Sequence, residues 1–97
     1  MYEIQVVNKK TYLGKGEYIG RPSPLGNPFF MKDESYRDSV CNQYKLWLEK
    51  NKNIPAIRKE LLRLLNIAKK GPLVLICWCA PKRCHGESIR DMLKSLD

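Results

Sequence analysis

The sequence contains a single histidine and no long apolar stretch, and these two features limit the kinds of active site and of membrane association that the protein can have. A membrane-spanning helix needs roughly 20 consecutive apolar residues, and no segment approaches that length. The first five residues also lack the basic and apolar regions of a signal peptide. We therefore expect a cytoplasmic protein without a membrane partner, whose four cysteines are thiols or metal ligands rather than disulfides.

The chain also lacks an internal repeat, a low-complexity segment and an arginine-rich tract. Its 97 residues, 29% of them charged, indicate one folded domain spanning 1–97 with a modest core. The net charge of +8 favours an anionic partner such as a nucleotide, a phosphate ester or nucleic acid. Because the basic residues are dispersed, a solvated basic surface explains the same charge equally well.

Hydrophobic periodicity predicts an order of two strands, two helices, one strand and one helix. The expected fold is therefore an α/β domain: a small, largely parallel sheet of three or four strands with packed helices, in a Rossmann-like arrangement of two or three layers. The expected elements are strands at 3–7 and 17–19, a helix capped by Asp33 or Ser35 and ending before 51–53, a helix at 55–69, a strand at 73–79 and a last helix to about 96.

The connection from strand 17–19 to strand 73–79 contains two helices, which makes it a crossover between parallel strands. Parallel strands share one carboxyl edge, and α/β proteins place their binding sites at that edge. If the two strands are neighbours, the loops that follow them face each other across one cleft. The functional hypothesis depends on this topology.

The first of these loops holds three prolines between residues 21 and 28, so it is stiff. Arg21 offers a planar fork that suits phosphate, and Asn27 offers both a donor and an acceptor. The alternative is a rigid connection in which Asn27 only makes a turn before Pro28. The expected ligand-binding residues are Gly20, Arg21, Ser23, Gly26 and Asn27, with Gly86 from the second loop.

The second loop follows an apolar strand and concentrates the reactive side chains, because three of the four cysteines and the histidine fall within 77–85. Cys84 and His85 precede a helix whose free N–H groups favour anions. His85 is the group that titrates near neutral pH, so it is the best general acid or base. We expect His85, Cys84 and Glu87 to be the catalytic residues, although structural roles explain the same side chains.

Two other kinds of site remain open for this loop. Cys77, Cys79, Cys84 and His85 supply a legitimate donor set for zinc, although their spacing is unusual. Cys84 and Arg90 match the Cys-x5-Arg spacing of a phosphatase loop, with a thiolate at a helix N-terminus. Apart from the zinc alternative, no metal or cofactor is expected.

Four segments together resemble the DUF4326 family, a group of small uncharacterised proteins common in phages and bacteria. They are the stretch Tyr18–Phe29, the Tyr-x-x-Trp-Leu of Tyr44–Leu48, Cys77–Pro81 and Cys84–Gly86. The resemblance covers nearly the whole chain. It implies a Rossmann-like fold akin to nucleotide- or nucleoside-handling domains, and host cytoplasm as the location if the protein is phage-encoded.

The sequence thus favours a nucleotide- or nucleoside-type ligand site at the carboxyl edge of a parallel sheet. If the protein is an enzyme, we expect transfer or hydrolysis on a nucleotide or nucleic acid. The alternatives are a non-catalytic basic module that binds nucleic acid or a host protein, and a Cys/His zinc domain.

Overall fold

The strand β3 (Leu73–Cys77) occupies the centre of a three-stranded sheet. It pairs in parallel with β1 (Ile4–Asn8) on one side and with β2 (Glu17–Tyr18) on the other. The structure, a computed structural model, describes residues 2–29, 31–80 and 82–96 of the chain. The expected crossover therefore joins neighbouring parallel strands, and the loops after β2 and β3 leave the same edge of the sheet.

Three helices connect and follow these strands. They are α1 (Arg37–Asn51), α2 (Pro55–Lys70) and α3 (His85–Leu96), and a short 3-10 turn, η1 (Glu34–Tyr36), precedes α1. The Asp33 carboxylate caps η1 by accepting from the backbone N–H of Ser35 at 2.8 Å. None of the helices in the described ranges is long and apolar enough to cross a membrane.

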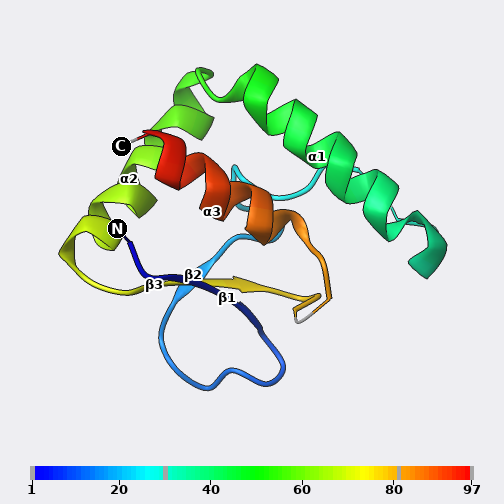
Figure 1. Cartoon of the computed structure of the whole chain (residues 1–97), viewed down its shortest axis with the longest axis horizontal. Coiled ribbons are helices and arrows are strands. Elements are labelled where there is room, and N and C mark those ends of the chain that lie inside the picture. The colour runs from blue at the N-terminus through cyan, green and yellow to red at the C-terminus, as the bar shows by residue number, and fades with distance from the viewer. Residues whose placement is uncertain (1, 30, 81, 97) are drawn as a thin grey trace.

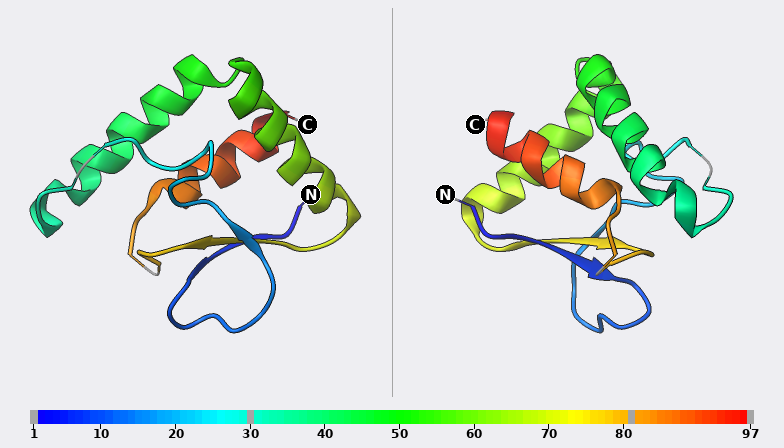
Figure 2. Two further views of the ribbon diagram at one scale, coloured as in Figure 1. Left: turned by 180° about the vertical axis from the view of Figure 1, so that it is seen from behind. Right: turned by 45° about the vertical axis from the view of Figure 1, so that its right-hand side comes forward.

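All three helices lie on one side of the sheet, where α2 and α3 contact the strands and α1 packs against α3 (Figure 1, Figure 2). The fold is therefore a two-layer α/β arrangement and not a three-layer one. Along β3, Leu73, Leu75 and Cys77 are buried, whereas Val74 and Ile76 are only half-buried. This alternation follows from the single helical layer, since successive strand side chains point to opposite faces and the helices cover one of them. The continuous apolar run of residues 73–79 predicts a strand that is buried on both faces, and this prediction is wrong for the face of Val74 and Ile76.

The helices bury most of the apolar faces that their periodicity predicts. In α1, the spacing of Tyr36, Val40, Tyr44, Trp47 and Leu48 predicts one apolar face. Val40, Tyr44 and Leu48 are buried with Cys41 beside them, and Trp47 is half-buried. Tyr36 is 48% exposed because it belongs to η1, which is out of phase with the α1 stripe. The predicted inward face of α2 is buried at every position: Ile57, Leu61, Leu64, Leu65 and Ala68.

The central strand ends at Cys77, two residues earlier than predicted. The side-chain amide of Asn8, at the end of β1, donates to the carbonyls of Trp78 at 3.1 Å and Ala80 at 3.0 Å. These bonds bend the chain away from the sheet because they take carbonyls that a longer strand would direct to a neighbour. Cys79 consequently lies in a loop rather than in a strand.

Gly86 allows α3 to approach the sheet closely. A Cβ at this position would lie 2.7 Å from Val6 Cγ1 and 3.0 Å from Ile19 Cδ1. We predict that Gly86→Ala lowers the free energy of unfolding by about 1–3 kcal/mol, the usual effect of overpacking, as measured by urea denaturation.

Gly71→Ala is the matched control, because a Cβ there has no heavy atom within 4 Å and the backbone is extended. Equal stability losses for the two variants would contradict this account of helix packing.

Candidate functional site

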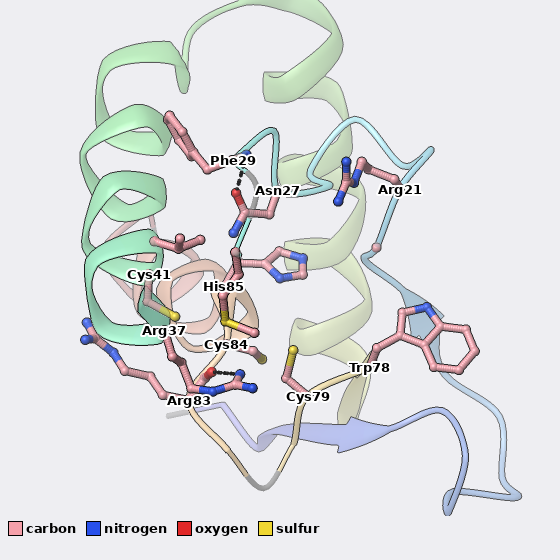
Figure 3. A pocket seen from close by; sticks show the side chains of 13 residues that line it. Arg21, Asn27, Phe29, Arg37, Cys41, Trp78, Cys79, Arg83, Cys84 and His85 are labelled. Carbon is pink, nitrogen blue, oxygen red and sulfur yellow. Dashed lines mark hydrogen bonds between the residues drawn. The ribbon is translucent and has the colours of Figure 1, made fainter. Parts of the chain in front are cut away.

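A cavity of about 270 Å³ opens where β2 and β3 end. Its walls come from the loops that follow these strands, from α1 and from the start of α3 (Figure 3). The predicted site residues that line it are Gly20, Arg21, Asn27, Cys84 and His85. The two loops therefore share one opening, as the topology requires.

The lining of the cavity is basic. Three arginines line it: Arg21 from the first loop, Arg37 from α1, and Arg83 from the second loop. None of the described residues around it carries a carboxylate. Positive groups gathered in a concave surface focus their field and raise the local concentration of anions. Arg37 and Arg83 are site residues that the sequence analysis missed.

Two of these arginines are held in place by exposed acids, Glu34 of η1 and Asp38 of α1. The Arg37 guanidinium donates from Nε and Nη2 to the two Glu34 oxygens at 2.8 and 2.7 Å, and from Nη1 to the Arg83 carbonyl at 2.9 Å. Arg83 donates to the Asp38 carboxylate at 3.1 Å and to Asn42 Oδ1 at 2.7 Å. Glu34 and Asp38 are exposed, so water screens both ion pairs.

His85 is buried at the base of the cavity, with 9% of its surface exposed. Its Nε2 lies 2.8 Å from the carbonyl oxygen of Ile19. A carbonyl only accepts, so Nε2 carries the hydrogen and Nδ1 is the unprotonated acceptor. Burial lowers the pKa of the imidazole; the Ile19 carbonyl opposes this shift, and the nearby charge of Arg21 adds to it.

The Nδ1 atom of His85 has no hydrogen-bond partner among the described residues. No fully enclosed side-chain nitrogen or oxygen among the described residues lacks a partner, so Nδ1 is not fully enclosed, and His85 is one of the residues that line the cavity. The Tyr44 ring packs edge-on against the imidazole at a centroid distance of 5.0 Å and fixes its plane. The cavity thus contains an oriented, neutral proton acceptor.

The stiff first loop owes its shape to internal hydrogen bonds. The Asn27 side-chain oxygen accepts from the Phe29 N–H at 2.9 Å, and the Asn27 amide nitrogen points toward His85 (Figure 3). Ser23 and Gly26 do not line the cavity. The Ser23 hydroxyl accepts from the Leu25 N–H, whereas a Cβ at Gly26 would lie 2.9 Å from the Arg21 backbone nitrogen. These two residues shape the loop that carries Arg21.

The accessible thiol in the cavity is Cys79 rather than Cys84. Cys79 is half-buried and its sulfur points into the cavity, whereas the other three cysteines are buried (Figure 3). The Arg37 guanidinium lies beside the Cys79 sulfur (Figure 3), and the hydrogen bonds to Glu34 together with this neighbouring sulfur raise the pKa of Arg37. Cys84 is 4% exposed, and its thiol donates to Cys77. Cys79 is therefore better placed than Cys84 to meet a ligand.

The remaining expected residues lie elsewhere. Glu87 and Arg90 line a separate hollow against β1, and Arg90 pairs with Asp91 at 3.4 Å. The Cys-x5-Arg spacing therefore does not form a phosphate cradle around Cys84. The Gly86 N–H donates to the Cys84 sulfur at 3.4 Å instead of facing the cavity, because Gly86 packs against β1.

The zinc alternative finds no geometric support. Within residues 2–29, 31–80 and 82–96, no three His, Cys, Asp or Glu side chains come together as a metal site. Cys77 and Cys84 are in contact, but Cys79 faces the cavity with Arg37 beside it. A guanidinium next to a candidate ligand disfavours a divalent cation by charge repulsion.

Comparison with known proteins agrees with the motifs of the two loops. A family model described as a domain of unknown function, DUF4326, matches residues 4–95. The chain belongs to the DUF4326 family. No curated protein and no solved structure matches it. The match spans both loops, α1, α2 and all but the last residue of α3, so the whole cavity falls inside the DUF4326 domain.

The position of His85 leads to a pH prediction. Because burial lowers its pKa, we expect the imidazole of this single histidine to titrate below the ordinary value of about 6.5 in an NMR titration. The unfolded chain binds the proton first as the pH falls, so acidification below about 6.5 destabilises the folded state.

His85→Gln should remove this contribution. The difference in thermal stability between wild type and variant should shrink as the pH falls from 7.5 to 5.5. A midpoint at or above that of a histidine peptide would contradict the buried, neutral imidazole.

Cys79 leads to a second prediction. Because Arg37 lies beside its sulfur and Arg21 and Arg83 line the same cavity, anionic iodoacetate should alkylate Cys79 several-fold faster, relative to neutral iodoacetamide, than it alkylates free glutathione. Mass spectrometry of the digested protein measures the two rates. Arg37→Gln should bring the ratio back toward that of glutathione, and a ratio in wild type no higher than that of glutathione would contradict a positive field at Cys79.

Proposed function

We propose that the cavity binds a small phosphorylated ligand of the nucleotide class. The observation that carries this proposal is the combination of three arginines and no carboxylate around a concave site at the carboxyl ends of parallel strands. A guanidinium matches phosphate oxygens in a bidentate geometry. The volume of about 270 Å³ lies just below the roughly 300–1,000 Å³ of typical ligand sites, which favours a mononucleotide over a larger ligand.

The apolar part of the cavity supports the same ligand class. Trp78 and Phe29 line it together with Met31 and Val40. The Trp78 indole is 50% exposed, and its N–H donates to the Tyr18 hydroxyl at 2.9 Å, which fixes the plane of the ring. A ligand with a charged end and a planar apolar end would use both kinds of wall. Nucleotides have this combination, whereas inorganic phosphate has only the charged end.

The reaction class we propose is transfer or hydrolysis on such a ligand. His85 Nδ1 is an oriented acceptor that can take a proton from an attacking hydroxyl or water. The Asn27 amide can donate to an oxygen of the ligand, and Cys79 is the accessible thiol on the opposite wall. Cys84 and Glu87 have no role in the proposed reaction. The Cys84 thiol donates its proton to Cys77, and Glu87 lies outside the cavity.

A binding experiment tests the proposal directly. We expect isothermal titration calorimetry to detect at least one nucleoside 5′-monophosphate at millimolar concentration or below, with weaker binding of inorganic phosphate and of the matching unphosphorylated nucleoside. Arg83→Gln should weaken nucleotide binding about tenfold, the loss expected for one charged contact to phosphate.

Arg90→Gln is the matched control, since it removes the same charge from a side chain of similar exposure, 34% against 37%, outside the cavity. Equal weakening by both variants would favour the basic-module alternative, in which overall surface charge binds nucleic acid. Absence of binding to every monophosphate would overturn the proposal.

A further inference from the structure

Two buried thiols meet where the central strand ends and α3 begins. Cys77 is the last residue of β3, and Cys84 directly precedes α3. Their sulfur atoms are 3.2 Å apart, and the two residues are 1% and 4% exposed. The separation is only roughly 1.2 Å longer than a disulfide bond, which is about 2.05 Å. Cys77 and Cys84 are seven positions apart in the sequence, so their sulfur atoms can meet only because the chain turns tightly after β3. The Asn8 amide stabilises this turn.

The contact between the sulfurs is a hydrogen bond. Cys84 donates its proton to Cys77, whose sulfur also accepts from the Ala80 N–H at 3.4 Å. The bond from Cys84 lowers the pKa of Cys77 and raises that of Cys84, so the pair loses one proton and keeps the other in the hydrogen bond between the two sulfurs. The pair therefore holds one thiolate more readily than two separated buried thiols would.

The pair is open to small molecules from one side. Cys84 lines the cavity, whereas Cys77 lies behind it. When the shared proton moves from Cys84 to Cys77 along the hydrogen bond, the negative charge moves to the sulfur that faces the cavity. A small neutral oxidant that enters the cavity can then meet a thiolate, which is the reactive form of cysteine.

We propose that Cys77 and Cys84 are an oxidation site, at which a hydroperoxide converts the two thiols into an intramolecular disulfide. In the first step the Cys84 thiolate attacks hydrogen peroxide, forming a sulfenic acid and releasing hydroxide. In the second step Cys77 attacks the sulfenic sulfur, the S–S bond forms and the sulfenic oxygen leaves as water. Two thiols are oxidised by two electrons and one peroxide is reduced to two waters. This proposal does not depend on the ligand of the cavity.

The consequence for the cavity follows from the position of Cys84. It is adjacent to His85, and its sulfur accepts from the Gly86 N–H at 3.4 Å. Drawing this sulfur toward β3 weakens that bond and displaces the first turn of α3, which carries the imidazole. Oxidation would therefore change the geometry around His85, and dithiothreitol would reverse it.

The experiment is peroxide treatment of the full chain, followed by alkylation of the remaining thiols, digestion with trypsin and mass spectrometry. We expect a cross-linked pair of peptides, one containing Cys84 and the other both Cys77 and Cys79, that dithiothreitol separates. On a non-reducing gel the product should run as a monomer. Single cysteines oxidised to sulfinic or sulfonic acid without a cross-link would overturn the proposal.

Variants decide which sulfurs are joined. Cys79→Ser and Cys41→Ser should each keep the cross-link, and Cys77→Ser should abolish it. Because Cys77 is buried and its variant can fail to fold, the Cys79→Ser result is the decisive one. Loss of the cross-link in folded Cys79→Ser, with folding checked by circular dichroism, would assign the bond to Cys79 and refute the proposed pair.

Discussion

The hydrogen bond between His85 Nε2–H and the carbonyl of Ile19 joins residues that are 66 positions apart in the sequence. Ile19 uses its own N–H to bond the carbonyl of Ile76 in β3 at 3.0 Å, so this residue connects the sheet to the first turn of α3. The same contact sets the tautomer of the imidazole and holds together the two loops that line the cavity. A water molecule in place of either partner would leave the loop after β2 and the helix free to separate.

Much of the fold follows from the sequence because its signals are local. The apolar spacing of α2 and the proline at its first position predict its bounds to within one residue. The two-helix crossover predicts parallel strands, and the structure confirms them. The end of β3 is harder to predict, because it depends on an amide from Asn8, about 70 residues earlier. The placement of all helices on one side of the sheet is also hard to predict from local sequence, since it depends on which face of the sheet each connection crosses.

The site was predictable at the level of segments but not of side chains. Pairing two strands brings their loops to one edge, so Arg21, Asn27 and His85 share a cavity. Which cysteine faces that cavity depends on the turn after β3, and this turn exposes Cys79 and buries Cys84. The sequence indicates little about the role of Arg37. It lies three residues after Glu34, and that spacing is typical of an ordinary ion pair on a helix rather than of a binding site.

The acids that hold Arg37 and Arg83 have a further consequence for ligand selection. Glu34 and Asp38 act as resident counter-anions for an otherwise positive cavity, and both face water. If the cavity binds an anion as proposed, that anion would displace these carboxylates from the guanidiniums, and the exposed carboxylates would be solvated by water instead. A singly charged anion gains little from that exchange, because it replaces one carboxylate with a similar group. On the function proposed above, a doubly charged group spanning both guanidiniums would gain more, so charge density would favour one anion over another before shape is considered.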